Sequence, residues 1–348
     1  MTPVHLLGRA TAVPKYVLRQ AEVEALGARV FADRAEMFER LRGVYANAGI
    51  ERRHSCMPLT WYLAPHGWAE RSRLYITHAV DLLESVASKA LDQAGIERME
   101  VDAIVVVSST GIATPSLDAL VMERMGFRRN VVRLPIFGLG CAGGVLGLAR
   151  AAALARSVPG SRVLLLVVEL CGLTFRNSDL SKSNIIATAL FGDGAAGAVL
   201  STEGDGPVLT GSAEHTWRDS LDVMGWHIEE DGFGVLFSRD IPDLVRKRMR
   251  AATDEALASL GLDIGNIDRI VSHPGGIKVI QALEEALDLV PGTMAEAREV
   301  LRTYGNMSAV TVFFVLERVL AAAPPTKQLY LLTSLGPGFT AAFLVIEG

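Results

Sequence analysis

The sequence predicts an α/β protein made of two copies of one folding unit, and two observations carry that prediction. Short apolar runs rich in β-branched residues alternate with longer helical patterns, and this alternation recurs at a constant offset along the chain. The clearest predicted strands span 102–108, 162–168, 267–272 and 328–334. The predicted helices span 77–94, 142–157, 243–260, 276–289 and 307–323. Because these strands are continuously apolar, we expect helices on both faces of the sheet.

The internal repeat appears at an offset of 166 residues. At this offset Asp102 falls on Asp268 and Cys141 falls on Met307, and no gap is needed between these positions. Any two α/β units look somewhat alike, but a shared register through helix, strand and turn favours duplication over chance.

A second stretch of similarity extends the repeat toward the end of the chain. Segment 192–200 resembles segment 336–345 at an offset of 144, which places an insertion near 169–191 of the first copy. Equivalent turns of two duplicated units should face each other, and ligands bind where such strand ends meet. We therefore expect the turn at Cys141 to lie near the turn at Asn306.

Composition excludes several classes of protein. Half of the 348 residues are hydrophobic and 21% are charged, so the chain can bury a large core. A net charge of −5 argues against a nucleic-acid partner. Three cysteines, Cys56, Cys141 and Cys171, argue against a disulfide framework. The sequence shows no signal peptide and no membrane span of the roughly 18 apolar residues required, so we expect a cytoplasmic protein.

Cys141 is the candidate nucleophile. It immediately precedes the predicted helix 142–157, where the helix dipole and free N–H groups stabilise a thiolate. The structural alternative is a small buried cysteine packed among Ala and Gly. The same segment contains Gly138-x-Gly140-x-x-Gly143, a dinucleotide-binding spacing, so an NAD(P)-dependent oxidoreductase is a remote alternative. Against it, the spacing lies mid-chain and places a cysteine where a pyrophosphate would pack.

His273 and Asn306 are the residues that we expect beside Cys141. His273 follows the predicted strand 267–272, at an active-site position of open α/β sheets, although a satisfied core histidine is the alternative. Asn306 precedes the helix predicted at 307–323 and could instead be its N-cap. A Cys–His pair can form an activated nucleophile, and Asn can donate a hydrogen bond to a developing oxyanion. No metal-ligand spacing accompanies the three residues.

Six segments carry a resemblance to a known family. They are Gly140–Gly144, Glu169–Arg176, Leu190–Ala196, His273–Gly276, Tyr304–Ser308 and Gly336–Thr340. In this order, along most of the chain, they resemble the type III polyketide synthases, the chalcone synthase-like family. Ketoacyl synthase III has a similar fold and Cys-His-Asn set, so a single-round condensing enzyme of that kind is the alternative. It does not share this series of motifs.

The resemblance implies a homodimer of thiolase-like subunits with αβαβα layers. Its halves would be 1–210, with the nucleophile, and 211–348, with His and Asn. The implied reaction is iterative decarboxylative condensation of malonyl-CoA onto an acyl-CoA starter held on Cys141, followed by cyclisation, with no cofactor beyond the CoA thioester substrates. His273 and Asn306 would bind the malonyl thioester carbonyl and stabilise the enolate. An imidazolium at His273 would also keep Cys141 ionised.

The resemblance also implies a substrate pocket. Phe191 matches the family's gatekeeper phenylalanine. The second gatekeeper aligns on Val235, and the methionine that crosses the plant dimer interface aligns on Thr114, so both positions lose bulk. The remaining predicted pocket residues are Ser109, Thr174 and Ser308. Together with a stretch around 224–242 that is more similar to bacterial members, this predicts a fatty acyl starter and an alkylpyrone or alkylresorcinol product, although Met224 or Trp226 could close the tunnel instead.

Three arginines are the candidates for binding the CoA phosphates. Arg42 matches a family arginine, and the lysines of the plant enzymes are mostly absent from the segment that contains it. Arg52 and Arg53 are expected to take their place, with a solvated basic turn as the alternative interpretation.

Overall fold

The computed structural model describes residues 2–324 and 326–348. Its strands are β1 (Val4–Ala12), β2 (Tyr16–Arg19), β3 (Arg52–Ser55), β4 (Ala103–Val107), β5 (Val132–Ile136), β6 (Val163–Leu170), β7 (Asp193–Ser201), β8 (Val208–Thr216), β9 (Met224–Glu229), β10 (Gly232–Phe237), β11 (Arg269–Ser272), β12 (Leu329–Gly336) and β13 (Thr340–Glu347). Its helices are α1 (Gln20–Val30), α2 (Ala35–Leu41), α3 (Gly43–Asn47), α4 (Trp68–Ala94), α5 (Leu117–Met125), α6 (Gly143–Ser157), α7 (Lys182–Leu190), α8 (Ile241–Ser259), α9 (Ile277–Ala286), α10 (Ala295–Tyr304) and α11 (Thr311–Ala321).

The sheet topology confirms the duplication. Within the described residues, nine strands form one sheet in the order β11-β12-β13-β8-β1-β7-β6-β4-β5. The series β1, β7, β6, β4 and the series β8, β13, β12, β11 pair in the same sense: antiparallel, antiparallel, then parallel. A short antiparallel contact between β1 and β8 joins the halves. Two copies of one unit therefore lie in a single body.

A duplicated side-chain contact marks the same relation. The carboxylate of Asp102 accepts a hydrogen bond from the backbone N–H of Arg162 at 2.7 Å, and that of Asp268 accepts one from the N–H of Leu329 at 2.8 Å. Each aspartate thereby connects the start of one parallel strand to the start of the next. The aspartates are 166 residues apart and their partners 167, so the predicted gapless register is wrong in detail.

The register slips further at the two central helices. The 3-10 turns that precede α6 and α11 begin at Gly140 and Ser308, 168 residues apart. Cys141 therefore corresponds to Ala309 rather than to Met307. Loops between the elements absorb these one- and two-residue differences, because loops tolerate insertions that a packed helix or strand does not.

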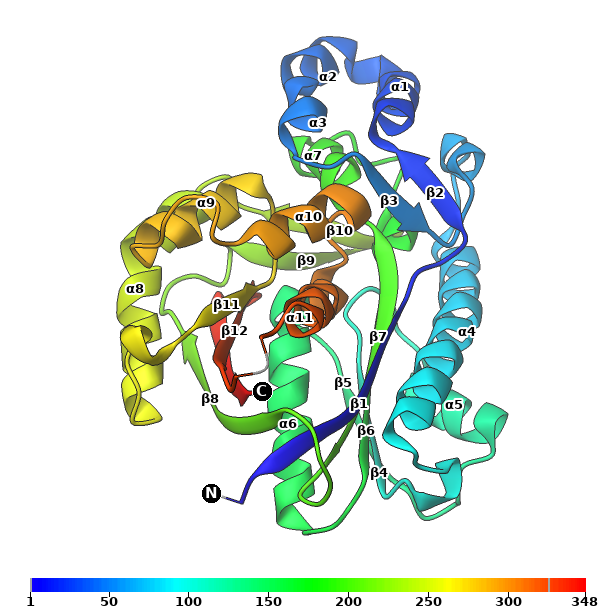
Figure 1. Ribbon diagram of the computed structural model, residues 1–348. Helices are drawn as coiled ribbons and strands as arrows, with labels where there is room; N and C mark the ends of the chain where they lie inside the picture. The colour runs from blue at the N-terminus through cyan, green and yellow to red at the C-terminus, as the bar shows by residue number, and fades with distance from the viewer. Residues whose placement is uncertain (1, 325) are drawn as a thin grey trace.

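The layers follow from this arrangement (Figure 1). Helices α6 and α11 lie between the two halves of the sheet, α4 and α5 cover the outer face of the first half, and α8 and α9 lie outside the second. This confirms the thiolase-like αβαβα order. At Gly144 a β-carbon would come within 2.2 Å of the Ala309 carbonyl oxygen, so only glycine allows the two central helices to approach this closely.

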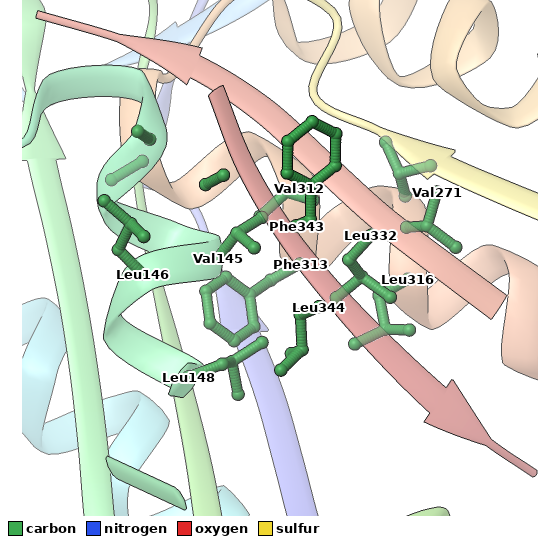
Figure 2. Packing of buried hydrophobic residues seen from close by; sticks show 14 of the residues in the cluster. Val145, Leu146, Leu148, Val271, Val312, Phe313, Leu316, Leu332, Phe343 and Leu344 are labelled. Atoms are coloured by element: carbon green, nitrogen blue, oxygen red, sulfur yellow. The ribbon is translucent and has the colours of Figure 1, made fainter. Parts of the chain in front are cut away.

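The larger core fills the space between the central helices and the second half of the sheet. Figure 2 shows Val145 and Leu148 of α6 and Phe313 of α11 packed against Leu332 and Leu344 of β12 and β13, and all five are buried. Burying each such side chain contributes about 1.5–3 kcal/mol. This packing holds the N-terminal ends of α6 and α11 in place.

Most predicted elements are present, with one informative difference. The helix predicted from residue 77 begins at Trp68. The predicted start is too late because Arg71 interrupts the apolar pattern of the sequence, although its side chain is buried in the structure. No helix in 2–324 or 326–348 combines the length and hydropathy that crossing a membrane requires.

Candidate active site

The predicted nucleophile lies where the sequence analysis placed it. Cys141 belongs to the 3-10 turn Gly140–Ala142, and α6 starts at Gly143. Its sulfur lies 4.0 Å from the Oδ1 atom of Asn306. The expected proximity of the two turns is therefore found. It results from the packing of α6 against α11, which brings residues 165 positions apart together.

His273 completes the group. It follows β11, and its backbone N–H donates to the carbonyl of Thr333 on β12 at 2.9 Å. Both ring nitrogens are buried and have no hydrogen-bond partner in the described chain. Cys141, His273 and Asn306 all line one cavity of about 410 Å³. A histidine with two unpaired ring nitrogens beside a thiol is not the satisfied core histidine that was the alternative.

Asn306 is held by its backbone and by its side chain. Its N–H donates to the Leu190 carbonyl and its own carbonyl accepts from the Gly192 N–H, both at 2.9 Å. Its Oδ1 accepts from the N–H of Ser308 at 2.8 Å, and its Nδ2 donates to the Gly275 carbonyl at 3.2 Å. The side chain thus organises the turn before α11, and the second N–H of its amide group is not used by these bonds.

A buried carboxylate that the sequence analysis did not select lies beside this group. Glu169 is the penultimate residue of the apolar strand β6 and is fully buried. It accepts hydrogen bonds from the N–H of Ser109 at 3.0 Å and from the hydroxyls of Thr110 and Ser308 at 2.8 and 3.4 Å. Burial raises its pKa to about 7, although these hydrogen bonds lower it. The signal in the sequence was an acidic residue at the end of a run of apolar residues.

Two further cavities lie near these residues. One, of about 480 Å³, is lined by Cys141 and by the predicted pocket residues Ser109, Phe191, Val235 and Ser308, together with Met224 and Trp226. The other, of about 630 Å³, shares Phe191 and Val235 with it, also contains Thr174, and extends between α1 and α7. The two cavities therefore share part of their wall, at Phe191 and Val235.

Comparison with known proteins identifies the family. Family models described as "Chalcone and stilbene synthases" match residues 2–204 with the N-terminal domain and 210–348 with the C-terminal domain. The chain belongs to this family, the type III polyketide synthases. These enzymes are acyltransferases that use CoA thioesters and need no additional cofactor.

Similar proteins cover nearly the whole chain. A putative chalcone synthase of Bacillus subtilis is 34% identical over 98% of this chain and 98% of its own. The 1,3,6,8-tetrahydroxynaphthalene synthase of Streptomyces peucetius is 36% identical over 97% of this chain and 91% of its own. The crystal structure of the corresponding Streptomyces coelicolor enzyme superimposes with a TM-score of 0.93 at 27% identity, covering 98% of both chains.

The protonation of the site differs from the expectation of a thiolate–imidazolium pair. Burial raises the pKa of Cys141 to about 12 and lowers the pKa of His273 to about 3. Desolvation disfavours both charged forms. Both shifts favour a neutral thiol and a neutral imidazole, and such an imidazole can take the thiol proton as a thiolate forms.

Arg53 of the synthase does not lie where the resemblance implied. Arg53 is only 2% exposed, and its guanidinium donates to the carbonyls of Thr188 at 2.6 Å and Phe191 at 3.2 Å and to the side chain of Gln20. It supports Phe191 from within and cannot reach a CoA phosphate in solvent. Thr114 is exposed on the segment that follows β4 and lines none of the three cavities near Cys141, so its place in the substrate pocket stays a prediction.

The other two arginines are exposed. Arg42 forms ion pairs with Glu24 at 2.5 Å and with Glu39 at 3.5 Å, which already balance its charge. Arg52 lies exposed at the start of β3. CoA binding by Arg42 and Arg52 stays a prediction.

Proposed function

We propose that this polyketide synthase extends an apolar acyl-CoA starter with malonyl-CoA over several rounds and releases an alkylpyrone or alkylresorcinol. The observation that carries the proposal is the cavity of about 630 Å³ next to the catalytic group. Much of its lining is apolar: Leu18, Val23, Leu26, Leu59, Phe175, Ala187 and Val235. Burial contributes about 0.8 kcal/mol per methylene, so eight methylenes contribute at most about 6 kcal/mol before ordering costs.

The catalytic roles follow from the neutral pair. As Cys141 attacks the starter thioester, His273 takes the thiol proton and returns it to the departing CoA thiolate. Malonyl-CoA then binds with its thioester oxygen facing the imidazole N–H of His273 and the unused amide N–H of Asn306. The bond between the carboxylate and the α-carbon breaks, carbon dioxide leaves, and the electron pair becomes an enolate that these donors stabilise.

The condensation closes the cycle. The enolate carbon attacks the acyl carbon on Cys141, the carbon–sulfur bond breaks, and the cysteine thiolate leaves. The lengthened chain, now a CoA thioester, returns to Cys141 for the next round. Ring closure follows when the chain is long enough to fold back on itself.

The names of the relatives favour a second candidate. Two of the proteins described above are named 1,3,6,8-tetrahydroxynaphthalene synthases, and such a product carries no alkyl chain. A synthase that builds a hydroxylated naphthalene from malonyl-CoA alone would fill the same cavity with the growing chain.

Product analysis separates these candidates. The enzyme is incubated with malonyl-CoA alone and with acetyl-, hexanoyl-, decanoyl- or 4-coumaroyl-CoA, and the products are weighed by mass spectrometry. We expect decanoyl-CoA to have the highest kcat/KM and its product to contain several malonyl-derived units. A single added unit would instead indicate ketoacyl synthase III-like chemistry, and a tetrahydroxynaphthalene from malonyl-CoA alone would support the second candidate.

We also infer a homodimer formed at β5, in the cytoplasm. β5 is an edge strand of the sheet, and Val132 and Leu134 on it and Phe137 after it are 55%, 38% and 53% exposed. An apolar edge strand is a surface that proteins usually cover. Exposed Thr114 belongs to the segment between β4 and α5, and such a dimer would bring it toward the partner subunit. The cysteines of the described chain are unpaired, as in a reducing compartment.

A further inference from the structure

The hairpin of β9 and β10 forms a wall of the substrate cavities without belonging to the main sheet. In the described chain its two strands pair only with each other. Met224, Trp226 and Phe237 of the hairpin line the cavity of Cys141, and Val235 lines both this cavity and the larger apolar one. A two-stranded hairpin is marginally stable on its own. Side-chain contacts must therefore set its position.

One end of the hairpin is held by stacked and hydrogen-bonded aromatic rings. The indole N–H of Trp226 donates to the Ser109 carbonyl at 2.8 Å. Phe233 packs against Trp226 and Trp68, with ring centroids 5.8 Å apart in both pairs. These contacts attach the body of the hairpin to α4 and to the segment after β4.

The turn of the hairpin is held by charge. The carboxylate of Asp231 accepts from Arg176 at 2.5 Å and from the Ser178 hydroxyl at 2.5 Å, and its backbone carbonyl accepts from Arg71. Gly232 has φ +138°, and a β-carbon there would lie 2.7 Å from the Arg71 guanidinium. Although partial burial acts in the opposite direction, the bonds from Ser178 and Arg176 hold the pKa of Asp231 below its ordinary value.

The same two arginines hold the opposite wall. Arg71 of α4 is buried and donates to the carbonyl of Phe175 at 3.1 Å and to those of Leu173 and Thr174 at 3.4 Å. Arg176 also binds Asp179 at 3.0 Å. The turn Cys171–Thr174 supplies Cys171 and Thr174 to the apolar cavity. Each arginine therefore connects the hairpin to the segment that faces it across the cavity.

We propose that Arg71, Arg176 and Asp231 form a clamp that sets the distance between these two walls and so determines how long a chain the cavity accepts. The three are positioning residues, because none of them belongs to the group that holds the reacting atoms. Charge in the clamp is balanced, since Arg71 and Arg176 face Asp231 and Asp179. Partly buried ion pairs of this kind can specify one geometry among several of similar energy. The proposal rests on the proposed function only in assigning the chain to this cavity.

The test compares Asp231→Asn with Glu230→Gln. Both changes replace an acid by its amide on the same turn, but Glu230 is an exposed neighbour outside the clamp. Three quantities are measured: the kcat/KM ratio of decanoyl- to hexanoyl-CoA, the mass distribution of the products, and malonyl-CoA decarboxylation. We expect Asp231→Asn to change the starter ratio at least about fivefold, equivalent to about 1 kcal/mol, and to broaden the product masses. Decarboxylation should be unchanged, and Glu230→Gln should resemble wild type.

Further variants separate positioning from loss of folding. Ser178→Ala removes a single hydrogen bond from an exposed residue and should shift the ratio in the same direction by a smaller factor. Arg176→Lys should retain more selectivity than Arg176→Met. A mass distribution and a starter ratio identical to wild type in Asp231→Asn and Ser178→Ala would overturn the clamp. So would an equal loss for every starter and for decarboxylation.

The product masses keep this result distinct from the proposed function. If wild type uses malonyl-CoA alone, the acyl-starter proposal fails, but the clamp still predicts a broader distribution of malonyl-derived chain lengths in Asp231→Asn. If wild type prefers decanoyl-CoA and the variant does so equally, the proposed function stands and the clamp is rejected.

Discussion

At Cys141, burial and the adjoining helix N-terminus act in opposite directions on the thiol. The helix favours the thiolate, but burial dominates and raises the pKa to about 12. His273 cannot offset this, because burial lowers its pKa to about 3 and it is neutral at pH 7. Both shifts therefore disfavour an anion at this site.

This protonation state predicts a pH dependence. Since the thiol is protonated well below its pKa, the rate of alkylation by iodoacetamide should rise about tenfold per pH unit between about pH 6 and 9. Peptide mass spectrometry should find Cys141 labelled before Cys56 and Cys171, which are buried with raised pKa values. A rate that levels off below about pH 7 would show a thiolate–imidazolium pair instead, and Cys141→Ala should abolish both labelling at this position and condensation.

The donors to the enolate give a second prediction. His273→Gln and Asn306→Ala should each lower malonyl-CoA decarboxylation by about 10²–10³, because each removes one donor to the same oxygen. The double variant should decarboxylate malonyl-CoA only slightly more slowly than the less active single variant, as for residues that act as a unit. Release of labelled carbon dioxide measures the step apart from condensation. Release of carbon dioxide at the wild-type rate in both single variants would show that neither residue stabilises the enolate.

At the scale of elements, the substrate cavity is shaped by segments far apart in the chain. Helix α1, the turn after β6, helix α7 and strand β10 all line it. The N-terminal elements β1 to β3 and α1 to α3 were not predicted: β2, β3 and α3 are only four or five residues long, and His5 and Arg9 interrupt the apolar residues of β1. Their contribution to the cavity was therefore outside what the sequence pattern could reveal.

Filling this cavity tests its role. Val235→Phe and Ala187→Phe should each lower kcat/KM for decanoyl-CoA about tenfold or more, because added bulk in a packed site costs about 1–3 kcal/mol. The kcat/KM for acetyl-CoA and the rate of malonyl-CoA decarboxylation should be unaffected. The matched control is Ile228→Phe, on the same hairpin but 67% exposed. Equal effects of all three substitutions on decanoyl-CoA would contradict the assignment of the chain to this cavity.

At the scale of the whole molecule, the two halves form one sheet whose two edge strands differ. β5 has no counterpart in the second copy within the described residues, and its apolar side chains are uncovered. A single chain therefore ends its sheet on a strand that can still pair. This asymmetry between the copies underlies the inferred dimer.

The inferred dimer predicts that substitutions at β5, and not elsewhere on the surface, reduce the mass of the particle in solution. In light scattering, wild type should have the mass of two chains, and the double variant Leu134→Glu, Phe137→Glu should have the mass of one. In a two-fold symmetric contact each new carboxylate occurs on both subunits, so the negative charges repel each other. Val158→Glu combined with Val290→Glu adds the same charge at exposed apolar positions elsewhere and should leave the mass unchanged. A wild type with the mass of one chain would reject the inference.

The sequence by itself determined the α/β class, the duplication, the order of the layers and the three turns that carry Cys141, His273 and Asn306. The α/β class and the duplication follow from local periodicity and register, whereas the order of the layers follows from the resemblance that the motifs carry. Tertiary structure alone decided what depends on burial. It placed Arg53 and Arg71 in the interior, favoured a neutral Cys141–His273 pair and brought Glu169 to the site. Desolvation is set by residues distant in the chain, so no local pattern encodes it.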